Sequence, residues 1–569
     1  MQRREFIQTL GAAAPAAIGT RAAELAAAGP AGAMVRPSEE PRVFLYDDGR
    51  HAAPLYQFAP PLKPVDLMFT VDQLVGSGVD TLVYFAGLEG GVALYDSRVA
   101  QRWGDNVTRW THPVFYRAAR HIHKLIAEGH DPLKLLCDRC HEKGLWFIAS
   151  NYLTLLGGKR TTDGGMGRKS DFVYEHPQFQ VGPDDDPRAK GVTSYRFSFL
   201  HEAFRAERFK VFHELLSRYE TDGIELNLAE FAPYCTFRQT GQLAPVLTEW
   251  LRALRDTARK AEESQGRRKR IYVRIPAHPD AWKLLGYDVP TWVREKLVDG
   301  LMCLPGLMES PMDQGADLSG AVRLTEQSAC RVIAAFSDLL GRQLERAATQ
   351  PMIWAAAANA YHGGANGFAI VDYHWSPNGW PWTSDDYKTL RLLGHPDLLA
   401  TADKIYRARS ALRRPELRGD WLPGVPLALP QPLEESKPVA VGLKIADDLK
   451  LRETEGTVQS VHLRVRLTNL EPSLNDVRIE LNGQLLPDSI RRLGDLTYRL
   501  YRLGAINPYG FVYDFQLPGE LYPKIGDNKV KVTLLKHDPN IDTRIELYDV
   551  DCAVNYRVHR HFQQPPIDY

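Results

Sequence analysis

The chain has 569 residues, which is more than one hydrophobic core usually serves, so we expect more than one domain. Lysine plus arginine and aspartate plus glutamate both number 70, so the formal net charge is zero. That balance argues against nucleic acid or an anionic membrane as a partner. Six cysteines in a chain of this length do not make a disulfide scaffold.

The N-terminus has the outline of a twin-arginine export signal. Arg3-Arg4-Glu5-Phe6-Ile7 precedes an Ala-rich, mildly apolar stretch that is too short and weak to remain as a membrane span. We therefore expect residues 1–35 to be a signal with a disordered segment. The expected location is periplasmic or extracellular, with no membrane insertion of the mature protein. A disordered basic tail is the alternative.

Residues 40–413 alternate short apolar runs with amphipathic helical stretches. Short runs rich in β-branched and aromatic residues are typical of buried parallel strands. The eight runs are 43–46, 81–85, 145–149, 223–227, 271–275, 300–304, 332–336 and 368–371. Such repeated alternation predicts an α/β fold of the (β/α)₈ TIM-barrel type. A doubly wound open sheet is the alternative, but no G-x-G-x-x-G motif follows the first run.

The composition changes after the predicted barrel. Residues 414–438 are rich in proline and predict a linker or a surface strap. Beyond them, runs such as 461–467 alternate apolar and polar residues, and Asn482-Gly483 predicts a two-residue hairpin turn. We therefore expect residues 439–569 to form an antiparallel β-sandwich. We expect this domain to have a structural role rather than to bind sugar, because its sequence shows no row of exposed aromatic residues.

The fourth run carries the strongest candidate catalytic residue. Because side chains of a strand alternate, Glu225 and Asn227 would point into the barrel while Ile224 and Leu226 face the helices. A carboxylate in a barrel mouth suits a catalytic acid, base or nucleophile. Arg274, on the next strand, could face Glu225 and keep it ionised. The same pair also fits a structural salt bridge inside the barrel.

Other strand ends supply candidate partners. Glycosidic cleavage usually needs two carboxylates, and Glu309 and Asp372 are candidates for the second. Aromatic side chains can stack on sugar rings, and polar ones can bind hydroxyl groups. The expected substrate-binding residues, besides Asn227 and Arg274, are Tyr95, Asp96, Arg98, Trp103, Asn151, His278, His374 and Trp375.

No cofactor or metal is expected. Cys137-Asp138-Arg139-Cys140-His141 matches a haem-attachment pattern, but the segment 131–141 has the pattern of an amphipathic helix running into a strand. We interpret its cysteines as helix-face residues. The closest histidine pairs have no acidic partners at metal-ligand spacing.

Three segments resemble a known family. They are 131–145, the Arg218–Leu226 stretch containing Asp222-Gly223-Ile224-Glu225-Leu226, and 286–299 with Gly286-Tyr287-Asp288-Val289. The chain resembles, over about residues 75–375, bacterial glycosyl-hydrolase-like barrel proteins, which are distantly related to family ten glycosidases and the α-amylase superfamily. The family pattern reads Gly-Ile-Glu-Leu-Asp, whereas this chain has Asn227 at the last position.

The resemblance implies an exported glycoside hydrolase that acts on a poly- or oligosaccharide. Glu225 would be nucleophile or base, with Glu309 or Asp372 as the acid. Two alternatives stay open at this stage. One is a carbohydrate-binding barrel without catalysis, which Asn227 favours. The other is a polysaccharide lyase or transglycosylase.

Overall fold

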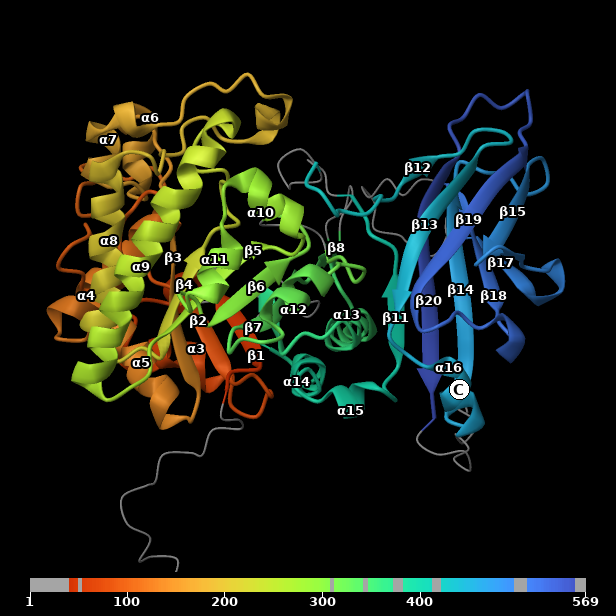
Figure 1. The fold of residues 1–569 in the computed structure, drawn as a ribbon, viewed down its shortest axis with the longest axis horizontal. Coiled ribbons are helices and arrows are strands. Elements are labelled where there is room, and N and C mark those ends of the chain that lie inside the picture. The colour runs from red at the N-terminus through yellow and green to blue at the C-terminus, as the bar shows by residue number, and fades with distance from the viewer. Residues whose placement is uncertain are drawn as a thin grey trace, which may run out of the picture.

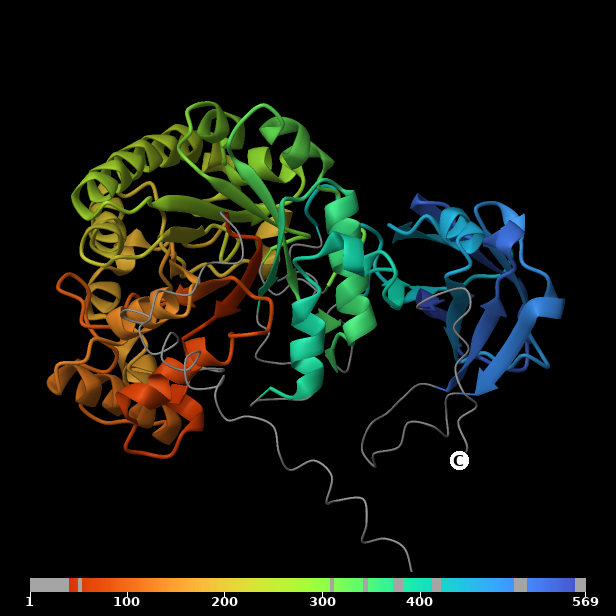
Figure 2. The same cartoon turned by 90° about the horizontal axis from the view of Figure 1, so that it is seen from below.

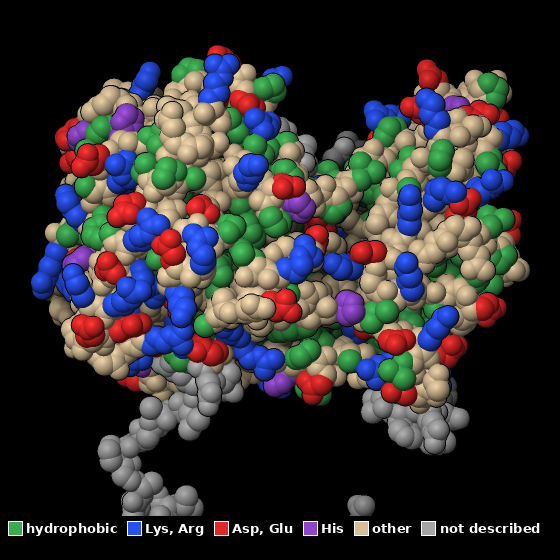
Figure 3. Space-filling view, in the orientation of Figure 1, with side chains coloured by type: hydrophobic (Ala, Val, Ile, Leu, Met, Phe, Trp, Pro, Cys, Tyr) green, Lys and Arg blue, Asp and Glu red, His purple; other side chains and the backbone are tan. Residues whose placement is uncertain are grey.

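The computed structural model describes residues 40–49, 54–307, 312–340, 346–371, 382–411, 421–495 and 509–557. They form a barrel lobe and a β-sandwich lobe that lie side by side (Figure 1). Both lobes carry positive and negative side chains interspersed over the face seen in Figure 3, as the balanced composition implies. None of the helices in the described ranges combines the length and hydropathy that crossing a membrane requires.

The barrel confirms the predicted fold class. Eight parallel strands close in the order β1-β10-β7-β6-β5-β4-β3-β2, and helices surround them (Figure 2). The strands are β1 Val43–Asp47, β2 Thr81–Phe85, β3 Trp146–Tyr152, β4 Gly223–Asn227, β5 Arg270–Pro276, β6 Gly300–Leu304, β7 Arg331–Ser337 and β10 Gly367–Val371. Nearly every strand residue is buried, as their apolar sequences predict.

The outer layer consists of helices that pack their apolar faces on the strands. The longer ones are α3 Pro64–Asp72, α4 Pro113–Ala127, α5 Pro132–Glu142, α8 Glu202–Ser217, α9 Thr240–Gln265, α10 Pro279–Leu285, α11 Val289–Arg294, α12 Ser319–Thr325, α13 Gln350–His362 and α14 Ser384–Arg391. α5 begins after Asp131, whose carboxylate accepts from the Leu133 N–H at 3.1 Å. It is the predicted helix of the Cys-x-x-Cys segment, and both cysteines are buried on it.

Strand alternation separates two apolar cores. Ile224 and Leu226 of β4 pack in the core between strands and helices. The barrel interior is filled instead by side chains of the opposite parity, among them Phe44, Tyr46, Val83, Ile148, Tyr152, Tyr272, Met302, Ile333 and Ala369. Glu225 has the interior parity, so it shares this space with aromatic and aliphatic groups.

A long excursion follows β3 and covers residues 153–201. It contains α6 Arg160–Asp163 and α7 Asp171–Glu175, which lie at the top of the barrel lobe in Figure 1. Its last residues return to the barrel, where the Phe199 N–H donates to the Tyr234 carbonyl at 2.8 Å. The excursion therefore contacts the loop that follows β4.

The C-terminal lobe is the predicted antiparallel sandwich. One sheet has the order β11-β20-β14-β18-β17, with β12 added on β20, and the other has the order β13-β19-β15-β16. The strands are β11 Lys404–Arg407, β12 Gln431–Pro432, β13 Pro438–Ile445, β14 Val458–Thr468, β15 Asp476–Leu481, β16 Gln484–Leu485, β17 Arg491–Asp495, β18 Gly510–Gln516, β19 Gly526–Lys536 and β20 Glu546–Tyr556. The predicted Asn482-Gly483 turn joins β15 to β16, with both residues at positive φ.

The two lobes meet at α13 and β11. β11 precedes the predicted linker but pairs with β20, so the sandwich sheet includes a strand from the segment assigned to the barrel. Gln314, which follows β6, donates to the carbonyls of Met352 and Ile405 and accepts from the Arg407 N–H at 2.6 Å. This side chain ties the barrel to the backbone of β11.

Candidate active site

Glu225 points into the barrel interior, as predicted, and forms an ion pair there. Arg274 Nε donates to Glu225 Oε1 at 2.8 Å, and Ser150 Oγ donates to Oε2. Glu225 has 0% and Arg274 2% of its surface exposed. The Arg274 guanidinium also lies over the Tyr46 ring, 4.3 Å from its centroid. Glu225 is therefore held from two sides in the barrel core.

The charges of this pair stabilise each other. Burial alone would lower the pKa of Arg274, but the neighbouring Glu225 carboxylate raises it well above its ordinary value. Burial, together with Glu225, raises the pKa of Tyr46. A fully enclosed carboxyl group bound to arginine matches the structural alternative that the sequence left open.

Glu230 is a second carboxylate that the sequence analysis missed. It follows the end of β4 by three residues and has 5% of its surface exposed. Asn227 Nδ2 donates to Glu230 Oε2 at 2.5 Å, while Asn227 Oδ1 accepts from the N–H groups of Ala229 and Glu230 at 3.3 and 3.2 Å. Asn227 thus shapes the turn and holds the carboxyl group that the turn presents. The Asn-x-x-Glu spacing is the signal that could have revealed it.

Carboxylates also follow strands on the far side of the barrel. In the strand order, β10 lies four strands from β4, and β1 and β7 each lie three strands away. Asp372 follows β10 directly in the sequence, Asp338 follows β7, and Asp47 is the last residue of β1. Asp338 and Asp47 are buried. These strands therefore carry acidic residues at the same end of the barrel as Glu230, although Asp47 shares the outward parity of Val43 and Leu45.

Four of the predicted site residues lie outside the part of the chain that the structure describes. Glu309, Asp372, His374 and Trp375 lie outside the described residues. Their assignment as catalytic or substrate-binding groups stays a prediction.

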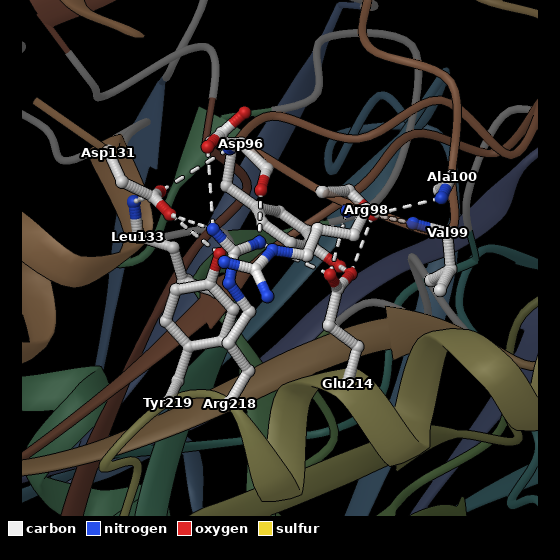
Figure 4. A network of polar contacts seen from close by, with 11 residues as sticks. Asp96, Arg98, Val99, Ala100, Asp131, Leu133, Glu214, Arg218 and Tyr219 are labelled. Carbon is white, nitrogen blue, oxygen red and sulfur yellow. Dashed lines mark hydrogen bonds and ion pairs between the residues drawn. The ribbon is translucent and has the colours of Figure 1, made fainter. Parts of the chain in front are cut away.

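The residues predicted after β2 lie on the outside of the barrel, against α8 (Figure 4). Tyr95 Oη donates to Glu214 Oε2 at 2.9 Å, and the Arg98 N–H donates to Oε1 at 2.7 Å. Arg218 bonds the Asp96 carbonyl and lies 3.4 Å from its carboxylate. The chain doubles back after β2, as the hydrogen bond from the Leu94 N–H to the Ala86 carbonyl shows.

Trp103 and Asn151 also face away from the mouth. Trp103 has no exposed surface and donates its indole N–H to the Met166 carbonyl at 3.2 Å, so it is a core residue. Asn151 has the outward parity of β3, and its Oδ1 accepts from Arg208 of α8 at 3.1 Å. The structure therefore does not bring Tyr95, Trp103 and Asn151 together with Glu225.

His278, the last of the predicted substrate-binding residues, lies just after the end of β5. Its Nδ1 accepts from the Asp280 N–H at 3.3 Å at the start of α10, and its side chain is 31% exposed. It is thus accessible from solvent at the same end of the barrel as Glu230. Among the described residues, no group of three or more histidine, cysteine, aspartate or glutamate side chains could hold a metal ion.

Comparisons with known proteins return similar structures but no family. No protein-family model and no curated protein matches the chain. The glycoside hydrolase domain of PgaB (BpsB) from Bordetella bronchiseptica is similar at 13% identity, with a TM-score of 0.39 over 62% of this chain and 98% of that one. The α-L-fucosidase isoenzyme 2 from Paenibacillus thiaminolyticus has 12% identity and a TM-score of 0.38, over 63% of this chain and 49% of that one.

A family 18 N-acetylglucosaminidase from Paenibacillus barengoltzii has 12% identity and a TM-score of 0.33, over 62% of this chain and 100% of that one. These structures are glycoside hydrolases by their names.

Proposed function

We propose that this chain is an exported glycoside hydrolase that cleaves a poly- or oligosaccharide at the carboxyl end of its barrel. The observation that carries the proposal is Glu230. It is a nearly buried carboxyl group on the first turn after β4, it accepts from the Asn227 amide, and it lies at the carboxyl end of the barrel strands, where barrels of this type place their active sites. Burying a carboxyl group is costly, and such groups concentrate at functional sites.

The division of roles follows from the partners of each carboxylate. Glu230 would donate a proton to the glycosidic oxygen as the carbon–oxygen bond breaks. A carboxylate across the barrel, Asp372 or Asp338, would either attack the anomeric carbon or take a proton from the attacking water. Glu225 is bound to Arg274, so it would stabilise the barrel interior beneath the site without contacting the substrate.

The test is hydrolysis of a panel of aryl glycosides and polysaccharides by the wild type and Glu230→Gln. We expect the wild type to release reducing ends from at least one substrate. Glu230→Gln should lose at least about a thousandfold in kcat/KM on natural glycosides, because proton donation is lost. Binding of the same glycan should persist. Full activity of Glu230→Gln would refute the assignment.

A carbohydrate-binding barrel without catalysis is the second candidate, and the replacement of the family aspartate by Asn227 favours it. Tight glycan binding with no reducing ends released by the wild type would support this candidate instead. Unsaturated sugar products, detected by ultraviolet absorbance, would identify a lyase, and transfer of glycan to an acceptor sugar would identify a transglycosylase.

Export rests on the Arg3-Arg4 pair and the apolar stretch after it. We expect the Arg3→Lys, Arg4→Lys double variant to remain inside the producing cell, while the wild type reaches the periplasm or the medium. Fractionation with a cytoplasmic marker measures this. Equal export of both proteins would contradict a twin-arginine route.

A further inference from the structure

The loop after β4 is fixed through its carbonyl oxygens. Tyr234 Oη lies 3.0 Å from the Asn227 carbonyl and 3.1 Å from the Glu230 carbonyl, and Tyr287 Oη donates to the Leu228 carbonyl at 2.7 Å. Both tyrosines are buried. The first half of the loop is therefore bonded to rigid aromatic side chains.

Arg196 fixes the second half of the same loop. It lies on the excursion after β3 and is 1% exposed. Its Nε donates to the Pro233 carbonyl at 2.5 Å and one terminal nitrogen donates to the Cys235 carbonyl at 2.8 Å, while the other bonds Thr193 of its own segment at 2.8 Å. One guanidinium thus joins the excursion to the loop that carries Glu230.

The chemistry of this contact is costly. Each described hydrogen bond of Arg196 ends on a backbone carbonyl, and burial lowers its pKa to about 10. Asp184 attracts the Arg196 charge, but none of the described hydrogen bonds of Arg196 ends on a carboxylate, so burying this cation is costly and a neutral side chain would stabilise the fold more easily. What only arginine supplies is a planar fork that reaches several carbonyls at once.

The loop also needs support from outside. Phe231 directly follows Glu230 and has φ of 59°, a left-handed conformation that residues with a side chain rarely adopt. A turn of this kind persists only when its surroundings hold it. The Pro233 carbonyl, two residues beyond Phe231, is one of the points at which Arg196 holds it.

We propose that Arg196 is a positioning residue for Glu230, acting through the backbone of the β4 loop across the contact with the β3 excursion. The inference rests on the proposed function, in which Glu230 is the proton donor. A displaced proton donor slows cleavage of poor leaving groups, which need the proton, far more than cleavage of good leaving groups, which do not. A general loss of folding would slow both alike.

The experiment compares wild type, Arg196→Lys and Glu230→Gln on two glycosides of one sugar, with a dinitrophenyl and with an alkyl leaving group. For Arg196→Lys we expect kcat on the alkyl glycoside to fall roughly 10- to 100-fold with little change in KM. The dinitrophenyl glycoside should lose less than about threefold. Glu230→Gln should show the same leaving-group pattern more strongly.

The matched control is Arg208→Lys. Arg208 is another buried arginine that donates to a backbone carbonyl, that of Tyr152, but it lies on α8, and its described hydrogen bonds go to β3 rather than to the β4 loop. Its variant should not discriminate between leaving groups. If Arg196→Lys does not fold, Arg196→Gln keeps an N–H donor and serves in the same comparison.

Equal losses on both glycosides, or the same pattern in Arg208→Lys, would overturn the positioning role while leaving Glu230 in place. If Glu230→Gln itself shows no leaving-group dependence, that result contradicts the proposed function of Glu230 as proton donor. The positioning role of Arg196, which depends on that function, is then contradicted as well. A leaving-group pattern in both Glu230→Gln and Arg196→Lys supports the proposal.

Discussion

Asn227 and Glu230 are in hydrogen-bond contact at 2.5 Å, and this contact requires a donor on residue 227. In Asn227→Asp two carboxyl groups would share that distance. They cannot both ionise there, so the pair would take up a proton. We expect the pH–rate profile of the proposed hydrolysis to move to higher pH, by at least about one unit. Identical profiles for the wild type and Asn227→Asp would contradict contact between these side chains in solution.

Asp80, which precedes β2, makes stability depend on pH. Burial raises its pKa to about 6 from its ordinary value of 3.8, although Thr81 and the N–H groups of Arg42 and Val43 bond it. The folded state therefore binds the proton more tightly than the unfolded state. The resulting stabilisation is complete below the unfolded pKa and is lost as pH rises through 6, about 3 kcal/mol in all.

Asp80→Asn removes this ionisation. We expect the unfolding free energy of the wild type, relative to Asp80→Asn, to fall as pH rises from about 4 to about 7, over the range set by the two pKa values. Urea titrations across that range measure it. The exposed Asp138, paired with Lys134, provides a control in Asp138→Asn. Parallel pH curves for the wild type and Asp80→Asn would rule out a raised pKa.

At the scale of elements, α8 anchors the segment that follows β2. Glu214 accepts from Tyr95, Ser97 and the Arg98 N–H, and it forms an ion pair with Arg218 at 3.2 Å (Figure 4). Glu214→Ala would leave these groups without their acceptor, so we expect a loss of about 3 kcal/mol.

Glu207→Ala on the same helix is the matched control. Glu207 pairs with the exposed Lys210, so its loss should cost less than about 1 kcal/mol. Chemical denaturation measures both variants. Equal losses of unfolding free energy in the two variants would show that Glu214 does not anchor the segment after β2.

At the scale of the whole molecule, the lobes are joined by polar contacts. Gln314 bonds three backbone groups around β11. Within the sandwich sheet, Arg407 of β11 forms a two-point ion pair with the buried Asp549 of β20, with both distances at 2.9 Å. Because Gln314 belongs to the barrel and β11 to the sandwich sheet, we expect the Gln314 bonds to couple the unfolding of the two lobes.

We expect calorimetry of the wild type to show one unfolding transition and that of Gln314→Ala to show two. The lost bonds should cost about 2 to 3 kcal/mol. Gln484→Ala, on the exposed strand β16, is the control and should leave the transition unchanged. A single unshifted transition in Gln314→Ala would mean that other contacts couple the lobes.

The fold could be predicted because its signals are local. Apolar runs specify the barrel strands, and alternation with an Asn-Gly turn specifies the sandwich. The inward direction of Glu225 and its contact with Arg274 follow from strand parity and strand order. These properties need no knowledge of distant contacts.

The site was less predictable because it depends on loops. Tyr95 was expected at the mouth, but its segment turns back onto α8 through bonds to Glu214, more than a hundred residues away. Glu230 is placed by a turn shaped by Asn227 and the left-handed Phe231. Neither strand nor helix periodicity reports such geometry.

The central claim is that the two carboxylates of the β4 segment have different roles: Glu225 stabilises the barrel and Glu230 takes part in catalysis. The most direct test measures thermal stability and hydrolysis for Glu225→Gln and Glu230→Gln side by side. We expect Glu225→Gln to lose stability, because Arg274 is left buried without its partner, by about 3 kcal/mol or more. Once folded at low temperature, it should keep measurable turnover. Glu230→Gln should keep its stability and lose turnover. The reverse pattern, with a stable but inactive Glu225→Gln and an active Glu230→Gln, would contradict the account.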